Sequence, residues 1–299
     1  MTCAPIALFV YNRLGHIRRT IEALKQNILA EDSELIIFSD AAKSEAQVNK
    51  VREVREYIQK IEGFKSVTIV EREVNLGLAR SIIDGVTTIV NEYGRIIVLE
   101  DDIVTSPYFL TYMNEALDVY QDEEKVMHIS GYMFPIDISG LPETFFLRTA
   151  SCWGWATWDR AWKYFSKEPQ KLLQEYSGKE IKVFNMDGTC NFWSQVEQNA
   201  SGLINTWAVF WYASVFRLGG LCLHPAFPMV NNIGHDATGE HCGQTSVFST
   251  GLAKRRVTYF EKKVIEGFLA HTRTKKFFRS IKPSIAKRIV AAIKRRVRA

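Results

Sequence analysis

The chain has 299 residues, which is enough for one large α/β domain with additions or for two small domains. Hydrophobic residues make up 46% of it and charged residues 24%, which is ordinary for a globular protein. No apolar run approaches the roughly 18 residues that a membrane span needs. The N-terminus also lacks a basic-then-apolar signal peptide, so we expect neither a membrane span nor a leader.

The net charge of +5 hides an asymmetry along the chain. Residues 273–299 contain eleven Lys or Arg and no acid, so the rest of the chain has a net charge of −6. The protein is therefore an acidic globule with a strongly basic tail. Charge alone would allow nucleic-acid binding, but the acidic body and the absence of a nucleic-acid motif argue against such a partner.

The cysteines are odd in number and scattered, with no CxxC pair. They are Cys3, Cys152, Cys190, Cys222 and Cys242. This pattern does not suggest a disulfide framework or a zinc site. We interpret these residues as reduced thiols of a cytoplasmic protein.

The first hundred residues or so alternate between short apolar runs and amphipathic segments. We predict strands over residues 5–10, 35–38, 66–70 and 95–99. We predict helices over residues 17–28, 46–61 and 75–90, the first with Ile17, Ile21, Leu24 and Ile28 on its apolar face. This alternation predicts a mostly parallel sheet flanked by helices. After residue 130 the regularity gives way to aromatic-rich segments.

Three acids, Glu100, Asp101 and Asp102, follow directly after the predicted strand at 95–99. The carboxyl ends of buried parallel strands are where open α/β sheets bind their ligands. Clustered carboxylates suit Mg²⁺ or Mn²⁺, which proteins commonly hold together with substrate phosphates. The alternative is an acidic loop that caps a helix beginning near Ser106.

Two other groups are predicted at the same edge of the sheet. Arg13 follows the first strand and could pair with a diphosphate, and Asp40 follows the second and could accept from a base imide or a ribose hydroxyl. Each residue alone could be a solvated loop charge, but their position at the same edge of the sheet favours a shared role in ligand binding. Asn75 and Arg80 bound a tight loop that enters a helix, where backbone amides attract anions. The alternative for that loop is a simple helix cap.

Two segments in the second half carry further candidates. Residues 151–158 contain three tryptophans, whose rings could stack on sugars or could pack in a core. Residues 230–242 contain His235, Asp236, Glu240 and His241 between glycines, which suggests a shaped loop. His241 could complete the coordination of a metal held by the acids, or it could be a surface histidine.

Several motifs in this order resemble those of the GT-A-fold nucleotide-sugar glycosyltransferases. The motifs lie at residues 75–80, 99–103, 106–109, 151–158, 206–214 and 232–236. The chain is similar to bacterial family 2-like sugar transferases of polysaccharide loci, and more distantly to N-acetylglucosaminyltransferase I of the Golgi. The likeness covers roughly residues 4–243.

The resemblance implies a role for each candidate at the donor site. Asp102, in a DxD-like motif, would contact the Mn²⁺ or Mg²⁺ that bridges the diphosphate of the sugar nucleotide. Asp101 or Glu100 would bind the ribose or the donor sugar. Arg13, Asp40, Asn75 and Arg80 would complete the nucleotide-sugar site, with Asp40 reading the base. Trp153, Gly154 and Trp155 would shape the donor and acceptor pocket.

One departure from the resemblance concerns the catalytic base. The Golgi relative carries a Trp-Asp pair whose aspartate is the base of an inverting transfer, whereas this chain has Trp207-Ala208. A methyl group cannot accept a proton, so a base would have to lie elsewhere. Asp236 is the first candidate, followed by Glu240 and Asp187. Whether transfer inverts or retains the anomeric centre stays open.

The resemblance also divides the chain into parts. We expect a GT-A domain over residues 1–245, with a nucleotide-binding half at 1–128 and an aromatic-rich acceptor half at 129–245. A connecting segment at 246–272 would lead to a basic amphipathic tail at 273–299. Such a tail is typical of an element that lies on an anionic membrane surface, and a disordered solubilising tail is the alternative.

The function expected from these features is transfer of a sugar from a nucleoside-diphosphate donor, UDP-linked, to a bacterial surface glycan such as lipopolysaccharide or capsule. The acceptor would be lipid-linked, and the enzyme would lie on the cytoplasmic face of the cell membrane. One alternative is a sugar-nucleotide-forming nucleotidyltransferase, although residues 11–15 are a poor version of its glycine-rich loop. Another is an inactive carbohydrate-binding module, which Ala208 favours and the three acids disfavour.

Overall fold

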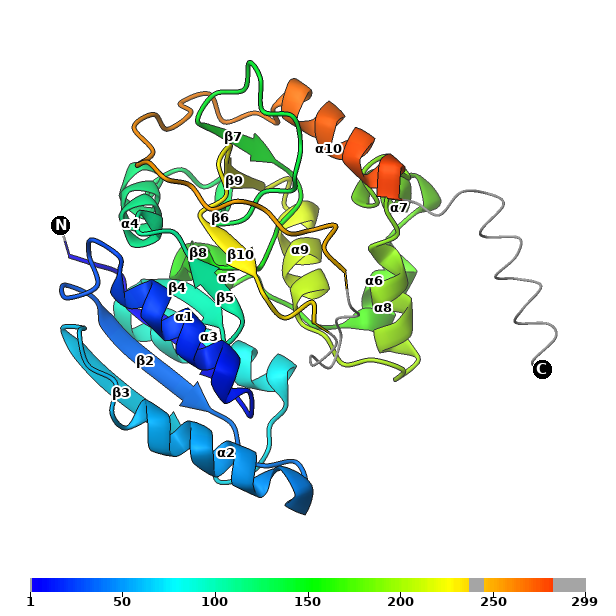
Figure 1. The fold of residues 1–299 in the computed structure, drawn as a ribbon. Coiled ribbons are helices and arrows are strands. Elements are labelled where there is room, and N and C mark those ends of the chain that lie inside the picture. The colour runs from blue at the N-terminus through cyan, green and yellow to red at the C-terminus, as the bar shows by residue number, and fades with distance from the viewer. Residues whose placement is uncertain (1, 237–244, 282–299) are drawn as a thin grey trace.

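The computed structural model describes residues 2–236 and 245–281 of the chain (Figure 1). The elements, in chain order, are β1 Ile6–Val10, α1 Leu14–Lys25, β2 Glu34–Ser39, α2 Glu45–Ile58, β3 Ser66–Glu71, α3 Leu78–Tyr93, β4 Arg95–Glu100, β5 Ile103–Thr105, α4 Phe109–Val119, β6 Val126–Ser130, β7 Thr144–Leu147, β8 Trp155–Trp158, α5 Asp159–Trp162, α6 Pro169–Glu175, α7 Gly178–Phe184, α8 Trp193–Ala200, α9 Ala208–Arg217, β9 Leu221–Pro225, β10 Val230–Asn232 and α10 Phe268–Ile281.

The main sheet of the described residues has eight strands in the order β3-β2-β1-β4-β8-β6-β9-β7. Neighbouring pairs from β3 to β4 are parallel, and so are β6 and β9, while β8 and β7 run antiparallel to their neighbours. A small antiparallel sheet joins β10 to β5, just beyond the end of β4. The predicted α/β class with a mostly parallel sheet is confirmed.

Both faces of the sheet are covered, because alternate residues of each strand point to opposite sides. Ile6 and Leu8 of β1 belong to the core beneath α1, α2 and α4. Ala7 and Phe9 belong to a second core, which contains residues of α3. The four strands predicted in the first hundred residues are confirmed. The first helix ends earlier than predicted, at Lys25, and Ile28 is exposed beyond it.

The aromatic residues of the second half extend the second core and build a further one. Trp155 of β8 lies with its ring centroid 5.4 Å from that of Trp207 and 6.1 Å from that of Trp211. A further cluster joins Phe184 of α7 to Tyr212 of α9, with centroids 4.2 Å apart. This second half therefore packs around stacked rings, and Ala208 begins helix α9 behind them.

Helix α10 crosses the boundary predicted at residue 273 between a connecting segment and a tail. Ala270, Thr274 and Phe278 of this helix are buried against the rest of the protein. The described part of the predicted tail is thus the second half of a docked helix, and the structure corrects that boundary. Residues 282–299, which carry the rest of the predicted tail, lie outside the described residues. Within the described ranges, every helix is too short or too polar to cross a membrane.

Ion pairs hold α10 in place. Asp187, in the loop after α7, lies 3.0 Å from His271 Nε2 and accepts from Lys275 Nζ at 2.6 Å. Glu266, just before the helix, accepts from Arg148 Nε at 2.9 Å and lies 3.4 Å from His271 Nδ1. His271 therefore sits between two carboxylates, and the bond to Glu266, then that to Asp187, raise its pKa against the opposing effect of burial.

The contacts of His271 with Asp187 and Glu266 make part of the free energy of unfolding dependent on pH. A histidine whose folded-state pKa is raised stabilises the fold below its unfolded pKa, and that contribution is lost as pH rises through the folded pKa. We expect the melting temperature of the wild type to exceed that of His271→Gln by a few degrees near pH 6, and the gap to shrink as pH rises through the raised folded-state pKa of His271. Thermal unfolding followed by circular dichroism measures both. A gap independent of pH would contradict this.

Candidate active site

The predicted candidates meet at the carboxyl ends of β1 and β4. These strands are parallel neighbours in which Phe9 lies opposite Glu100, so the loop carrying Arg13 lies beside the acids. The third contributor is the chain that follows β10. Because Asn232 pairs with Ile103 across the small sheet, residues 233–236 continue over the same edge. The site thus joins segments more than a hundred residues apart in sequence.

Arg13 binds both buried aspartates of this edge. Its Nη2 donates to Asp102 Oδ2 at 2.8 Å and also bonds Asp101, to which Nε donates at 3.3 Å. The aspartates are 5% and 6% exposed, so these charges are largely removed from water. Thr20 of α1 donates to the backbone oxygen of Asp101 at 2.8 Å and holds the turn in place.

The site carries an excess of negative charge. Burial, followed by the charges of Asp102 and Asp101, raises the pKa of Glu100 to about 8. Burial also raises the pKa of Asp101 to about 6, although Arg13 opposes that shift. Burial would lower the pKa of Arg13, but the attraction of the two aspartates outweighs it and raises that pKa. One arginine is therefore too little positive charge for three ionised acids.

Within the group formed by Arg13 and the two aspartates, Asp102 Oδ1 and Arg13 Nη1 are buried and lack a hydrogen-bond partner among the described residues. A buried carboxylate oxygen without a partner is the kind of atom that a cation satisfies, and a buried guanidinium N–H suits an anion. Residues 2–236 and 245–281 hold no ready cluster of three or more His, Cys, Asp or Glu around a metal position. The residues therefore fit an ion that completes its shell with substrate oxygens.

Gly234 lies directly on Asp102. A Cβ at this position would stand 2.0 Å from Asp102 Oδ2 and 3.1 Å from Arg13 Nη1. The loop is fixed by Ile233 N, which donates to the backbone oxygen of Asp102 at 2.9 Å, and by Gly234 N, which donates to Asn232 Oδ1 at 2.8 Å. Only glycine allows this approach without moving the carboxylate.

His235 belongs to the site although the sequence analysis gave it no role. Its ring lies 5.2 Å from that of Trp153 and 5.8 Å from that of Phe248. Both ring nitrogens are buried and lack a partner in the described part of the chain, so the imidazole is available to a ligand or a metal. The only sequence signal was its position beside Asp236 in the predicted loop.

Asp236 is the one base candidate that the structure places at this edge. Its Oδ2 lies 3.1 Å from Nε2 of His16, near the start of α1, and its side chain is 44% exposed. Asp187 instead binds helix α10, where bonds from Lys275 and His271 outweigh the effect of burial and lower its pKa to about 2. An acid held in this way is a poor base. Glu240 and His241 lie outside the described residues.

Asp40 binds the loop that enters α3. Its carboxylate accepts from the backbone N–H groups of Leu76 at 2.9 Å and Gly77 at 2.8 Å, and from Asn75 Nδ2 at 3.1 Å. A further bond comes from its neighbour Ala41 at 2.9 Å. All four bonds come from its neighbour Ala41 and from the loop that enters α3, so the carboxylate positions that loop. Its predicted role in reading the base stays a prediction.

The aromatic prediction is corrected in part. Trp155 is completely buried and lies among Trp162, Trp207 and Trp211, so it cannot line a pocket. Gly154 is buried too, and a Cβ on it would meet Val230 at 2.7 Å. Trp153 is half-buried and touches His235, so it alone of the three lies at the site. Arg80 is exposed on α3, beside a hollow shared with Lys167 and Asn205.

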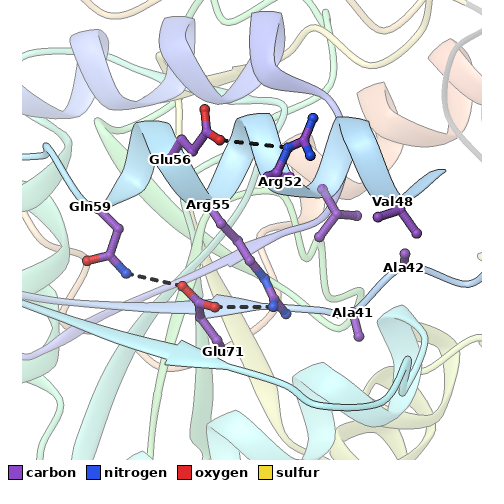
Figure 2. Close-up of a pocket in the computed structure, with 9 residues that line it drawn as sticks. Ala41, Ala42, Val48, Arg52, Arg55, Glu56, Gln59 and Glu71 are labelled. Carbon is purple, nitrogen blue, oxygen red and sulfur yellow. Dashed lines mark hydrogen bonds and ion pairs between the residues drawn. The ribbon is translucent and has the colours of Figure 1, made fainter.

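An open hollow lies next to Asp40, between α2 and the ends of β2 and β3 (Figure 2). It has a volume of about 430 Å³ and begins at Ala41 and Ala42. Figure 2 shows Arg55 reaching across it to Glu71, and the two charged groups are 3.1 Å apart. The hollow therefore has room for a planar group, between side chains that already pair with each other.

Residues 6–128 match the sequence model of glycosyl transferase family 2. This match confirms the predicted resemblance to family 2 sugar transferases over the first part of the chain. It covers Arg13, Asp40 and the three acids, but not Trp153, His235 or Asp236. A comparison with curated proteins gives no match.

Two solved structures are similar to parts of the chain. A mannosyltransferase from Pyrobaculum calidifontis, in complex with GDP-Man and Mn²⁺, has a TM-score of 0.42 and 10% identity, with 72% of this chain and 68% of that chain covered. TarS from S. aureus has a TM-score of 0.36 and 13% identity, with 60% of this chain covered. This similarity spans only 31% of the TarS chain.

The contact of Gly234 with Asp102 can be tested by one methyl group. We expect Gly234→Ala to displace the Asp102 carboxylate and to weaken Mn²⁺-dependent nucleotide binding by about tenfold or more, with a loss of about 1–3 kcal/mol of stability from overpacking. Calorimetric titration and thermal unfolding measure the two effects. Gly251→Ala is the matched control, because a Cβ there meets nothing within 4 Å. Equal nucleotide binding by the two variants would contradict the prediction.

Proposed function

We propose that this protein is a metal-dependent glycosyltransferase that takes its sugar from a nucleoside-diphosphate donor. The observation that carries the proposal is the pair of buried aspartates, Asp101 and Asp102, bound to Arg13 at the carboxyl end of β4. Asp102 there keeps one buried oxygen without a partner among the described residues. The family match over the same residues supports it.

The chain's own residues would bind and orient the diphosphate. Asp102 would hold a divalent ion, with His235 as a second candidate, and Arg13 Nη1 would donate to a phosphate oxygen. When bound, Mn²⁺ or Mg²⁺ neutralises the charge that develops on the departing nucleoside diphosphate. Glu100 and Asp101 would accept from hydroxyl groups of the ribose or the donor sugar. The nucleoside would lie over Ala41, beside the hollow of Figure 2.

Asp236 is the base that we propose for the acceptor hydroxyl. Its position at the acid edge supports this role, because a sugar held by the acids would lie beside it, and its contact with His16 orients one carboxylate oxygen. An exposed carboxylate can accept a proton from an incoming hydroxyl group and pass it to water. With Asp236 in this role, transfer would follow the inverting route, in which a single base faces the acceptor.

For the acceptor we propose a bacterial surface glycan, lipid-linked and reached from the cytoplasmic side of the cell membrane. For the donor we propose a UDP-sugar. The support for both is the resemblance in sequence, and for the membrane also the basic C-terminal residues. Residues 282–299, beyond the described part of the chain, contain seven Lys or Arg and no acid.

The metal role of Asp102 predicts a defined loss. We expect Asp102→Asn to lower metal-dependent turnover of the sugar donor by roughly 100-fold or more, because it removes a charged metal ligand. Turnover across a panel of sugar nucleotides, with and without Mn²⁺, is the measurement, and Asp122→Asn on an exposed turn is the control. Full metal-dependent turnover by Asp102→Asn would show that Asp102 is not a metal ligand.

The same titrations separate the competing classes. A UDP-sugar transferase should bind UDP more tightly than GDP, and only with the metal present. A nucleotidyltransferase should instead release pyrophosphate from a nucleoside triphosphate and a sugar phosphate. A glycan-binding module should bind no nucleotide at all.

The role of Asp236 predicts a change in kcat rather than in donor binding. We expect Asp236→Asn to lower kcat by about 100-fold or more, which is the usual loss for a general base, while KM for the donor stays within about twofold. Steady-state kinetics with the donor found in the panel give both values. A rise in KM with unchanged kcat would show that Asp236 binds the donor and is not the base.

A further inference from the structure

Helix α10 presents an apolar edge to solvent at its first turn. The side chain of Phe268 is 84% exposed, that of Ile265 just before the helix 52%, and that of Leu269 40%. A phenylalanine exposed to this degree on a helix end loses the free energy that burial would give it. Figure 1 shows α10 on the outside of the molecule, and the residues of this helix that are buried include Ala270, Thr274 and Phe278. The edge falls largely in the segment that the sequence analysis treated as a connector.

Exposed cations flank this apolar edge in sequence, and the helix itself contains no acid. Lys262 and Lys263 precede it, and Lys276 and Arg279 continue its exposed side along the helix. The other two cations of α10 turn inward: Arg273 donates to the backbone oxygens of Asp137 and Ser139, and Lys275 binds Asp187. The inner side of α10 therefore has cations that bind other parts of the protein, and its outer side has exposed cations.

The inner side of α10 connects to the candidate active site through aromatic rings. Phe277 lies 6.0 Å from Phe248 between ring centroids, and Phe248 lies 6.1 Å from Trp153. Trp153 in turn contacts His235. A surface on the outside of α10 would therefore stand a few rings away from the acid edge.

We propose that the outer side of α10, with the apolar residues Ile265, Phe268 and Leu269 and the cations Lys262, Lys263, Lys276 and Arg279, docks on an anionic lipid bilayer. Exposed apolar side chains enter the interface between headgroups and acyl chains, and Lys or Arg beside them attract anionic headgroups. Residues 282–299 add seven Lys or Arg and no acid to this end of the chain. Residues 1–272 have a net charge of −6, so the basic end of the chain is the part that an anionic bilayer attracts most strongly.

Docking in this orientation would bring the rings of Phe248 and Trp153 close to the membrane surface. An acceptor carried by a lipid could then reach Trp153 without leaving the bilayer. This inference rests on the proposed function only for the lipid-linked acceptor. The contact with the bilayer itself depends on α10 and not on the donor site.

Co-sedimentation of the full chain with vesicles tests the proposal. The vesicles contain phosphatidylcholine alone or with about 30% phosphatidylserine, and no donor or acceptor is added. We expect binding to the anionic vesicles only, weakened when salt screens the charges. The double variant Phe268→Ser/Leu269→Ser should lower the partition coefficient about tenfold, and Lys276→Gln/Arg279→Gln should lower it by a similar factor.

Two control variants match these changes away from α10. Leu203→Ser removes a side chain that is 76% exposed in the turn after α8, and Lys60→Gln removes an exposed cation after α2. Both should bind vesicles like the wild type. Unchanged binding by the α10 variants, or no binding by the wild type, would overturn the proposal. A wild-type dimer that Phe268→Ser/Leu269→Ser makes monomeric, without vesicle binding, would also overturn it, because the edge would then belong to a second copy.

Failure of this proposal can be told apart from failure of the proposed function. The α10 variants leave Asp102 and Arg13 untouched, so metal-dependent nucleotide binding should persist in them. Vesicle binding lost with nucleotide binding intact would confirm the docking surface alone. Asp102→Asn, in contrast, should still bind the vesicles.

Discussion

Two buried aspartates that share one arginine determine the arrangement of the candidate site. Removing a carboxylate from water costs several kcal/mol unless a cation compensates it, and removing one partner of such a group costs about 3–5 kcal/mol. Arg13 supplies that cation to Asp101 and Asp102, so the loop after β1 is tied to the end of β4. With Glu100 beside them, three acids face one positive charge. The pKa of Glu100, which burial and its two neighbours raise to about 8, expresses that imbalance, and a divalent cation is the group that would remove it.

The surrounding backbone is built around this charge cluster. The carboxylate of Asp40 binds the loop that enters α3, and Gly234 brings the chain after β10 into contact with Asp102. Both arrangements fix backbone and leave few side chains to reach a ligand. The consequence is an open edge in which Arg13, Asp102 and His235 keep buried polar atoms without partners among the described residues. These atoms, rather than a deep cavity, mark the place where a ligand would be held.

The sequence predicted the features that depend on short-range pattern. Strand and helix periods are local, so the parallel sheet and the position of Glu100 at a strand end followed from the first hundred residues. At the candidate site, the differences from prediction concern contacts between segments far apart in the chain. A pattern cannot tell that the carboxylate of Asp40 is saturated by residues 75–77, or that Trp155 stacks on Trp207 in a core. His235 was missed for the same reason, because only the packing of Trp153 and Phe248 isolates its ring nitrogens.

The neutral side chain of His128 links the second core to the segment that bears Trp153. Nδ1 of His128 accepts from Trp211 Nε1 at 3.0 Å, so the hydrogen of the ring lies on Nε2, which donates to the backbone oxygen of Ser151 at 3.0 Å. Burial, and then the nearby His224, lower the pKa of His128 to about 3, so both bonds persist at neutral pH. Ser151 stands two residues before Trp153. The aromatic core of the second half therefore sets the position of the one tryptophan that reaches the candidate site, which explains why so many rings in this segment are packed although only one lies at the acid edge.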